Sequence, residues 1–213
     1  MAATSTFQPA GGAGLASDHF TLFGLPQRFV LDVEALTEAW RRLQAAVHPD
    51  RFAGAGAAQA RLAMQWSSQI NEAYRTLKDP QARAAYLCEL RGASIDAHRN
   101  TAMPTSFLMQ QMEWREELAQ AREQGADQAK ARLAREVDAA RDATLERLRT
   151  LLDDTPDDAE AAQAAADEVR VLMFIDRFRQ DLGARSRAAA PAQGHVPGHA
   201  SAQASTSNGQ RAA

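Results

Sequence analysis

The sequence predicts an all-α protein with two helical domains between two tails. Every long segment with a regular apolar pattern repeats with helical period, and no segment alternates convincingly like a strand. Proline, glycine and aspartate interrupt this pattern at points typical of helix ends. Residues 1–17 and 184–213 consist mainly of small and polar residues with little to bury, so we expect both to be disordered.

The N-terminal domain, residues 18–92, is expected to contain four helices. A short helix fits "HFTLFGLP", with Ser17 or Asp18 at its start, and Asp32 is a plausible N-cap of the second helix. The remaining helices are expected at about 33–48, 57–78 and 81–90. Apolar stripes on the second and third helices match each other, which predicts an antiparallel hairpin.

The C-terminal domain, residues 105–183, follows a linker at 93–104 and is expected to be a three-helix bundle. Its helices are expected at about 105–123, 126–152 and 158–182. Gly125 and the acidic turn "DDTPDD" separate these helices. Such short connections make consecutive helices antiparallel neighbours.

The charge distribution differs between the two halves of the chain. The whole protein has a net charge of −3, which does not indicate bulk attraction to nucleic acid or to an acidic membrane. Residues 17–92 carry a net charge of +1, whereas residues 93–185 carry −6. We therefore expect no nucleic-acid or membrane partner, and the acidic half is the more distinctive one.

The single cysteine, Cys88, excludes a disulfide or a cysteine metal site within the chain, and we expect a buried, inert thiol. His195 and His199 lie in the C-terminal tail with no helix to align them, so we expect no metal site or other cofactor.

No run reaches transmembrane length, and the first basic residue is Arg28, so no targeting segment is visible. We expect a cytoplasmic protein.

The second helix is interrupted at His48, Pro49 and Asp50. Arg41 lies on the same helix face as His48, and Arg42 is also outside the apolar stripe. A catalytic acid–base pair is disfavoured because a short loop between helices provides neither a pocket nor a third, orienting group. Taken alone, the triplet fits a plain connection and an exposed recognition loop equally well.

The neighbouring motifs decide between these interpretations. "DHFTLFGLP", "AWRRLQAAVHPDRF" and "INEAYRTLKDPQARAAY" occur in this order, and together they resemble a J-domain, the module that activates DnaK-type chaperones. The resemblance assigns six residues to chaperone binding: Arg41, Arg42, His48, Pro49, Asp50 and Arg51. Many J-domains carry a further basic residue at the position of Ala46.

The resemblance also implies a mechanism in which the chemistry belongs to the partner. The basic helix would find an acidic surface on the ATPase domain of the chaperone. Asp50 would then engage a cationic group near the interdomain linker of the chaperone, while Pro49 keeps the loop stiff. The protein would be an activator of ATP hydrolysis and not an enzyme.

The first helix of the C-terminal domain has two apolar faces. One stripe contains Phe107, Trp114, Leu118 and Ala121, and the other, on the opposite side, contains Leu108, Met109 and Met112. A helix at a domain surface needs only one buried stripe. The second stripe is therefore either an exposed binding surface or a face covered by the fourth helix or the linker.

Two further features favour the binding surface. Glu113 and Glu116 flank the second stripe, which gives an apolar patch with an acidic rim. The glutamates have no histidine or cysteine nearby, so metal chelation is disfavoured. Phe174 lies off the centre of the last helix's apolar stripe, and we expect it to extend the exposed patch.

The same region carries a closer resemblance. "TSFLMQQMEWREEL", followed about fifty residues later by "VRVLMFIDRF", resembles the HscB family, the J-proteins of bacterial iron–sulfur cluster assembly. The likeness covers about residues 18–183. It implies that the C-terminal helices bind the cluster scaffold protein IscU, through these residues: Leu108, Met109, Met112, Glu113, Glu116 and Phe174. Gln120 stands where the family often has an acidic residue, and the N-terminal cysteine metal site of eukaryotic members has no counterpart.

The leading hypothesis is a monomeric co-chaperone that delivers IscU to the DnaK-type chaperone HscA and stimulates its ATPase. A first alternative is a J-domain co-chaperone for a different client. A second alternative is a structural helical interaction protein whose His48–Asp50 loop is incidental. We expect a monomer because no third apolar face is available for self-association.

Overall fold

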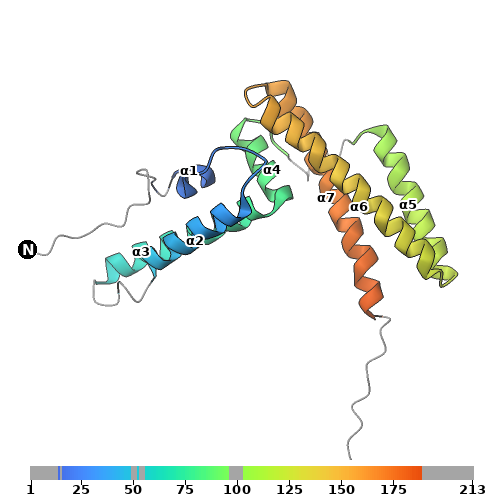
Figure 1. Ribbon diagram of the computed structural model, residues 1–213, viewed down its shortest axis with the longest axis horizontal. Coiled ribbons are helices and arrows are strands. Elements are labelled where there is room, and N and C mark those ends of the chain that lie inside the picture. The colour runs from blue at the N-terminus through green and yellow to red at the C-terminus, as the bar shows by residue number, and fades with distance from the viewer. Residues whose placement is uncertain (1–13, 15, 49–51, 53–55, 96–102, 189–213) are drawn as a thin grey trace, which may run out of the picture.

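The structure is a computed structural model that describes residues 14, 16–48, 52, 56–95 and 103–188. These residues form two groups of helices, α1 to α4 and α5 to α7, and the described part of the chain has no strand (Figure 1). The all-α prediction is therefore confirmed. Most of the two predicted tails lies outside the described residues.

The N-terminal helices begin and end close to the expected positions. They are α1 His19–Phe23, α2 Val33–Val47, α3 Ala57–Lys78 and α4 Pro80–Leu90. The predicted N-caps at Asp18 and Asp32 are both present, each with a carboxylate that accepts two backbone N–H groups of the first turn. Gly24 ends α1 with a φ of 69°, in the left-handed region that favours glycine.

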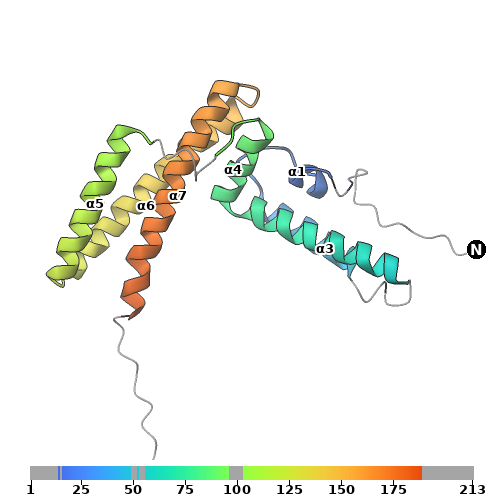
Figure 2. The same ribbon diagram turned by 180° about the vertical axis from the view of Figure 1, so that it is seen from behind.

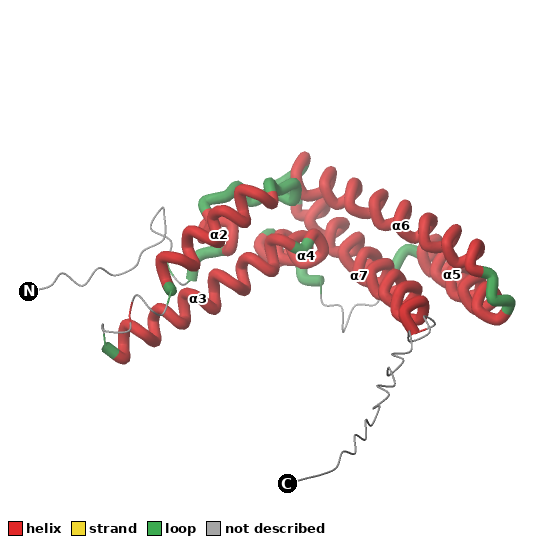
Figure 3. Tube along the Cα trace, turned by 60° about the horizontal axis from the view of Figure 1, so that its bottom comes forward, coloured by secondary structure: helices red, strands yellow, loops and turns green. Residues whose placement is uncertain are grey.

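The α2–α3 hairpin extends away from the C-terminal helices. The C-terminal end of α2 and the N-terminal end of α3 are the parts farthest from them (Figures 1 and 3). The side chains of Trp40 and Gln44 both donate to the amide oxygen of Asn71, at 3.0 and 2.8 Å, and so tie the two helices together. Their apolar faces form the core of the domain.

The C-terminal helices differ from the expected ranges at two places. They are α5 Thr105–Glu123, α6 Asp127–Arg149 and α7 Ala159–Ala188, with a π-helical turn, η3, at Thr150–Asp154. The expected helix at 126–152 thus changes to a wider turn at Thr150. The last helix runs six residues beyond its expected end at 182, into the predicted tail, because alanine and arginine are strong helix formers and no proline occurs before Pro191.

Two apolar clusters make up the core, and α7 contributes to both. The second cluster lies among α5, α6 and α7, around the fully buried Trp114. The first cluster joins α1 to α4 with Leu148, Leu152 and one face of α7. Figure 2 shows α4 between α3 and α7, where it makes this connection. The two domains therefore share a continuous core.

The beginning of the predicted linker is part of this core. Ala93 and Ile95 are buried, and the buried guanidinium of Arg170 on α7 donates to the backbone carbonyl of Ile95 at 3.1 Å. Residues 96–102 lie outside the described residues. None of the described helices is long and apolar enough to cross a membrane.

Candidate functional site

Two surfaces carry the residues that the sequence singles out, and the first is the basic face of α2. Leu36, Leu43 and Val47 are buried on one side of this helix, which leaves Arg41 and Arg42 exposed on the other. The arginines therefore lie where the sequence predicts, on the solvent side of the hairpin.

Positive charge continues from α2 onto α3. The ammonium of Lys78 lies 5.3 Å from the ring centroid of Tyr74, which itself stacks on Trp40 at 4.8 Å. A hydrogen bond with Thr37 lowers the pKa of the Tyr74 phenol, with smaller contributions from the positive charges of Lys78 and Arg41. The basic face thus spans both helices of the hairpin.

His48 is the residue at which α2 ends. It is exposed, and its backbone is extended, with φ −57° and ψ 131°. This conformation fits a residue that precedes proline, because the proline ring disfavours helical geometry before it. Pro49, Asp50 and Arg51 lie outside the described residues. Of the predicted chaperone-binding residues, the structure therefore places Arg41 and Arg42 on the exposed face of α2 and His48 at its C-terminal end.

The second surface is the outer face of α5. The side chains of Leu108, Met109 and Met112 are 39%, 60% and 69% exposed, whereas Trp114 and Leu118 on the inner face are buried. The alternative in which the fourth helix covers this stripe is wrong for the described residues. We call the three exposed side chains the apolar stripe of α5.

The apolar stripe of α5 has an acidic border. Glu113 and Glu116 are exposed on the same helix, as the sequence predicts. Gln120, one turn later, donates to the Glu116 carboxylate at 3.3 Å. The carboxylates thus remain at the surface, and no described group of three or more histidine, cysteine, aspartate or glutamate side chains is placed to hold a metal ion.

Phe174 does not lie off the core, where the sequence led us to expect it. Its ring is half-buried and lies 5.5 Å from Phe107 and 6.2 Å from Phe178, measured between ring centroids, so it packs against the second core cluster. The guanidinium of Arg115 lies 5.3 Å from the same ring. The apolar sector of α7 is wider than one stripe because this helix packs on both clusters.

Sequence reasoning did not single out Met173. This side chain is 37% exposed on α7, directly before Phe174. The available signal was the run "VRVLMFI", which holds more apolar residues than a single helix face can bury. Met173 is thus an additional large apolar side chain at the surface of the C-terminal domain.

Cys88 takes no part in either surface. It is fully buried, and burial raises the pKa of its thiol to about 11. The predicted buried thiol is confirmed.

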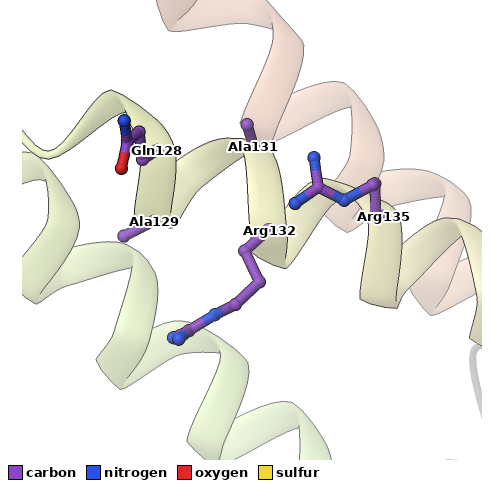
Figure 4. A pocket seen from close by; sticks show the side chains of 5 residues that line it. All are labelled: Gln128, Ala129, Ala131, Arg132 and Arg135. Atoms are coloured by element: carbon purple, nitrogen blue, oxygen red, sulfur yellow. The ribbon is translucent and has the colours of Figure 1, made fainter.

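A shallow depression on α6 is also separate from both surfaces. Figure 4 shows the residues that line it: Gln128, Ala129, Ala131, Arg132 and Arg135. The guanidinium of Arg132 reaches across to Glu117 on α5, with which it forms an ion pair. None of the residues predicted to bind a partner lines this depression. The two candidate surfaces are exposed helix faces, which suit protein partners better than small-molecule ligands.

Comparisons with known proteins agree with this division. Residues 18–86 match the DnaJ domain family, and residues 103–183 match the family described as the HSCB C-terminal oligomerisation domain. The chain is 54% identical over 172 residues to a co-chaperone protein HscB homolog of Burkholderia multivorans, covering 80% of this chain and 95% of that protein. It is 50% identical over 169 residues to the homolog of Bordetella avium, covering 79% and 97% of the two chains.

Solved structures show the same fold. The chaperone HscB from Vibrio cholerae has 36% sequence identity to this chain and a TM-score of 0.68, over 81% of this chain and 99% of that one. Human co-chaperone protein HscB, at 22% identity, has a TM-score of 0.73, over 84% and 85% of the two chains, and supports the fold alone.

These matches remove the alternative of a purely structural helical protein, because they cover both domains. A J-domain implies an Hsp70-type chaperone as partner, and a co-chaperone of this kind is not itself an enzyme. The arrangement of a basic hairpin and a second helical domain across one core, together with these similarities, shows that the chain belongs to the HscB family of J-domain co-chaperones.

Proposed function

We propose that this co-chaperone acts in the cytoplasm, where it brings the scaffold protein IscU to the chaperone HscA, stimulates its ATPase and so assists the maturation of iron–sulfur proteins. The observation that carries the proposal is the apolar stripe of α5, which lies exposed on the side opposite the buried stripe of the same helix. Family membership supports HscA as the chaperone.

The apolar stripe of α5 has the chemistry of a protein-binding surface. Burial of Met109 and Met112 against a partner would remove apolar area from water at about 25 cal/mol per Å². Flexible methionine side chains adapt to the shape of a partner. Glu113 and Glu116 add a charged border that selects for a partner with basic residues around an apolar centre.

The basic face of α2 has the chemistry of a chaperone-docking surface. Arg41 and Arg42 are exposed, and the positive charges of Arg41 and of Lys78 on α3 both act on Tyr74, so positive charge is present on both helices of the hairpin. Such a surface accelerates encounter with an acidic partner, and the acceleration falls as salt increases. In this proposal Pro49, Asp50 and Arg51 complete the contact beyond His48.

The proposal is tested by measuring ATP turnover of an HscA-type chaperone with this protein, with IscU, and with both. We expect the two together to stimulate turnover more than the product of their separate effects. His48→Gln should abolish the contribution of this protein, and Glu38→Gln, on an exposed position of the same helix, should leave it intact. Stimulation that does not depend on IscU would favour a J-protein for another client.

The client surface is tested with a double substitution, Leu108→Ala and Met109→Ala. We expect IscU binding, measured by titration calorimetry, to weaken by about tenfold or more, as for residues that anchor an interface. Because both side chains are exposed, the free energy of unfolding should change by less than about 0.5 kcal/mol. Unchanged binding would contradict the assignment.

Two matched variants accompany this test. Met64→Ala removes a methionine on α3 that is 65% exposed, and it should affect neither binding nor stability. Phe174→Ala belongs to a different class, because this ring packs against Phe107 and Phe178. We expect it to lower the free energy of unfolding by roughly 1–3 kcal/mol, less than a fully buried phenylalanine would. If Phe174→Ala weakens IscU binding, this result alone would therefore not show that Phe174 contacts IscU, because the substitution also destabilises the protein.

A further inference from the structure

Asp153 connects the two domains through a pair of hydrogen bonds. Its two carboxylate oxygens accept the backbone N–H groups of Phe29 and Val30, at 2.6 and 2.9 Å. The donors lie in the loop between α1 and α2, and the acceptor lies in η3, more than 120 residues later in the chain. Hydrogen bonds to a carboxylate are stronger and more directional than neutral ones.

The loop that Asp153 holds is also packed from the other side. The ring of Phe29 is buried, and the guanidinium of Arg83 on α4 lies 5.3 Å from its centroid. Arg83 is itself buried and donates to the backbone carbonyl of Leu77 at the end of α3. The loop is thus fixed between α4 of the N-terminal domain and η3 of the C-terminal domain.

The π-helical turn explains why Asp153 reaches this loop. Leu152, the residue before it, is fully buried in the core shared by the two domains. Asp153 is half-buried at the edge of that core. Turns of this kind are rare and are frequently found at functional sites.

We infer that Asp153 is a positioning residue, which sets the orientation of the basic face of α2 relative to the apolar stripe of α5. The inference builds on the proposed function, since a fixed orientation lets one molecule present the scaffold and the J-domain to the same chaperone. Arg170, which holds Ile95 at the exit from the N-terminal domain, supports the orientation at a second point. The hydrogen bonds of Asp153 and of Arg170, together with the shared core, restrict rotation of one domain relative to the other more than a single attachment point would.

The orientation is measured with paired spin labels on the full chain. Gln65→Cys on α3 and Ala139→Cys on α6 are exposed labelling sites, and the buried Cys88 thiol, with its pKa raised to about 11, does not compete for label. We expect a narrow distribution of label distances in the otherwise unchanged protein and a broader one after Asp153→Ala. Asp154→Ala is the matched control, because this exposed carboxylate is adjacent in sequence and pairs with Arg149 of α6, at 3.5 Å.

The functional consequence is measured without labels. In the absence of IscU, the Asp153→Ala variant should stimulate the chaperone ATPase as much as the unchanged protein does, because the basic face of α2 is untouched. The extra stimulation that IscU adds should fall by about threefold or more, within the range by which residues between two sites alter their coupling. Direct IscU binding should not change. Circular dichroism confirms folding, and Asp153→Asn, which retains a single acceptor oxygen, should give an intermediate result.

The outcomes separate this inference from the proposed function. A narrow distance distribution in Asp153→Ala overturns the positioning role, and so does a broad distribution with the IscU-dependent stimulation unchanged. If the unchanged protein shows no IscU-dependent stimulation, the proposed function fails. The distance distributions then still decide whether Asp153 sets the orientation of the domains.

Discussion

His19 shows how a single side chain links a short helix to the rest of the N-terminal domain. Its ring stacks on Tyr86 of α4 with 4.3 Å between centroids, and its backbone N–H donates to the Tyr86 hydroxyl at 3.0 Å. Its Nδ1 atom is buried without a hydrogen-bond partner among the described residues. Burial lowers the pKa of the imidazole, against the opposing negative charges of Glu72 and Asp18.

This lowered pKa predicts a loss of stability in mild acid. Below the ordinary value of 6.5 the unfolded chain binds a proton that the folded chain resists, so the free energy of unfolding decreases as the pH falls toward the folded-state pKa. His19→Phe keeps a stacked ring and removes the titration. We expect urea midpoints of this variant to change less between about pH 7.5 and 5.5 than those of the unchanged protein. Equal changes in both proteins would contradict the assignment.

At the same scale, residue exposure was predicted well on α5 and less well on α7. The helical period alone separates Leu108, Met109 and Met112 from the buried stripe, because α5 packs on one side only. Phe174 was misplaced because its surroundings come from α5, which is distant in the sequence. His48 was placed correctly at the end of α2, and its role, like those of the three residues after it, remains a prediction.

At the scale of elements, helix caps carry much of the information that the sequence makes available. Asp32 caps α2 through the N–H groups of Glu34 and Ala35, at 2.9 and 3.0 Å. Asp79 caps α4 through the N–H of Ala82 at 2.7 Å, with Pro80 in the first turn. These local signals explain why α2 and α4 begin close to where the sequence predicts.

The cap of α2 predicts a defined cost for its removal. Asp32→Ala should lower the free energy of unfolding by about 1 kcal/mol, because two backbone N–H groups lose their acceptor. Glu38→Ala, at an exposed position of the same helix, should change it by less than about 0.5 kcal/mol. Urea denaturation followed by circular dichroism measures both values. Equal effects of the two substitutions would show that the cap does not contribute to stability.

The end of α6 lacks such a local signal. The turn to η3 at Thr150 depends on Leu152 entering the core shared with the N-terminal domain and on Asp153 meeting a loop from that domain. Neither contact is visible in the local pattern of "LRTLLDDTPDD". Three ion pairs also join α6 to α7: Arg141–Asp176, Arg147–Glu168 and Arg179–Asp138.

At the scale of the whole molecule, the two domains share a core, so we expect them to unfold together. Leu152→Ala should lower the free energy of unfolding by about 2–5 kcal/mol, as expected for a fully buried leucine. Because Leu152 belongs to the first cluster, which joins α1 to α4 with the end of α6 and one face of α7, amide hydrogen exchange should accelerate in α3 as well as in α6. Leu90→Ala, at a leucine that is 40% exposed, is the control. Acceleration confined to α6 would show that the domains open independently.

The sequence by itself determined the helical fold, the helix starts, the basic face of α2 and the apolar stripe of α5, because these depend on periodicity and caps within about twenty residues of chain. The tertiary structure decided that Ala93 and Ile95 are buried, that α7 packs on two clusters, and that Asp153 joins η3 to the loop before α2. Each of these contacts pairs segments far apart in the sequence. Their partners are specified only when the whole chain is folded.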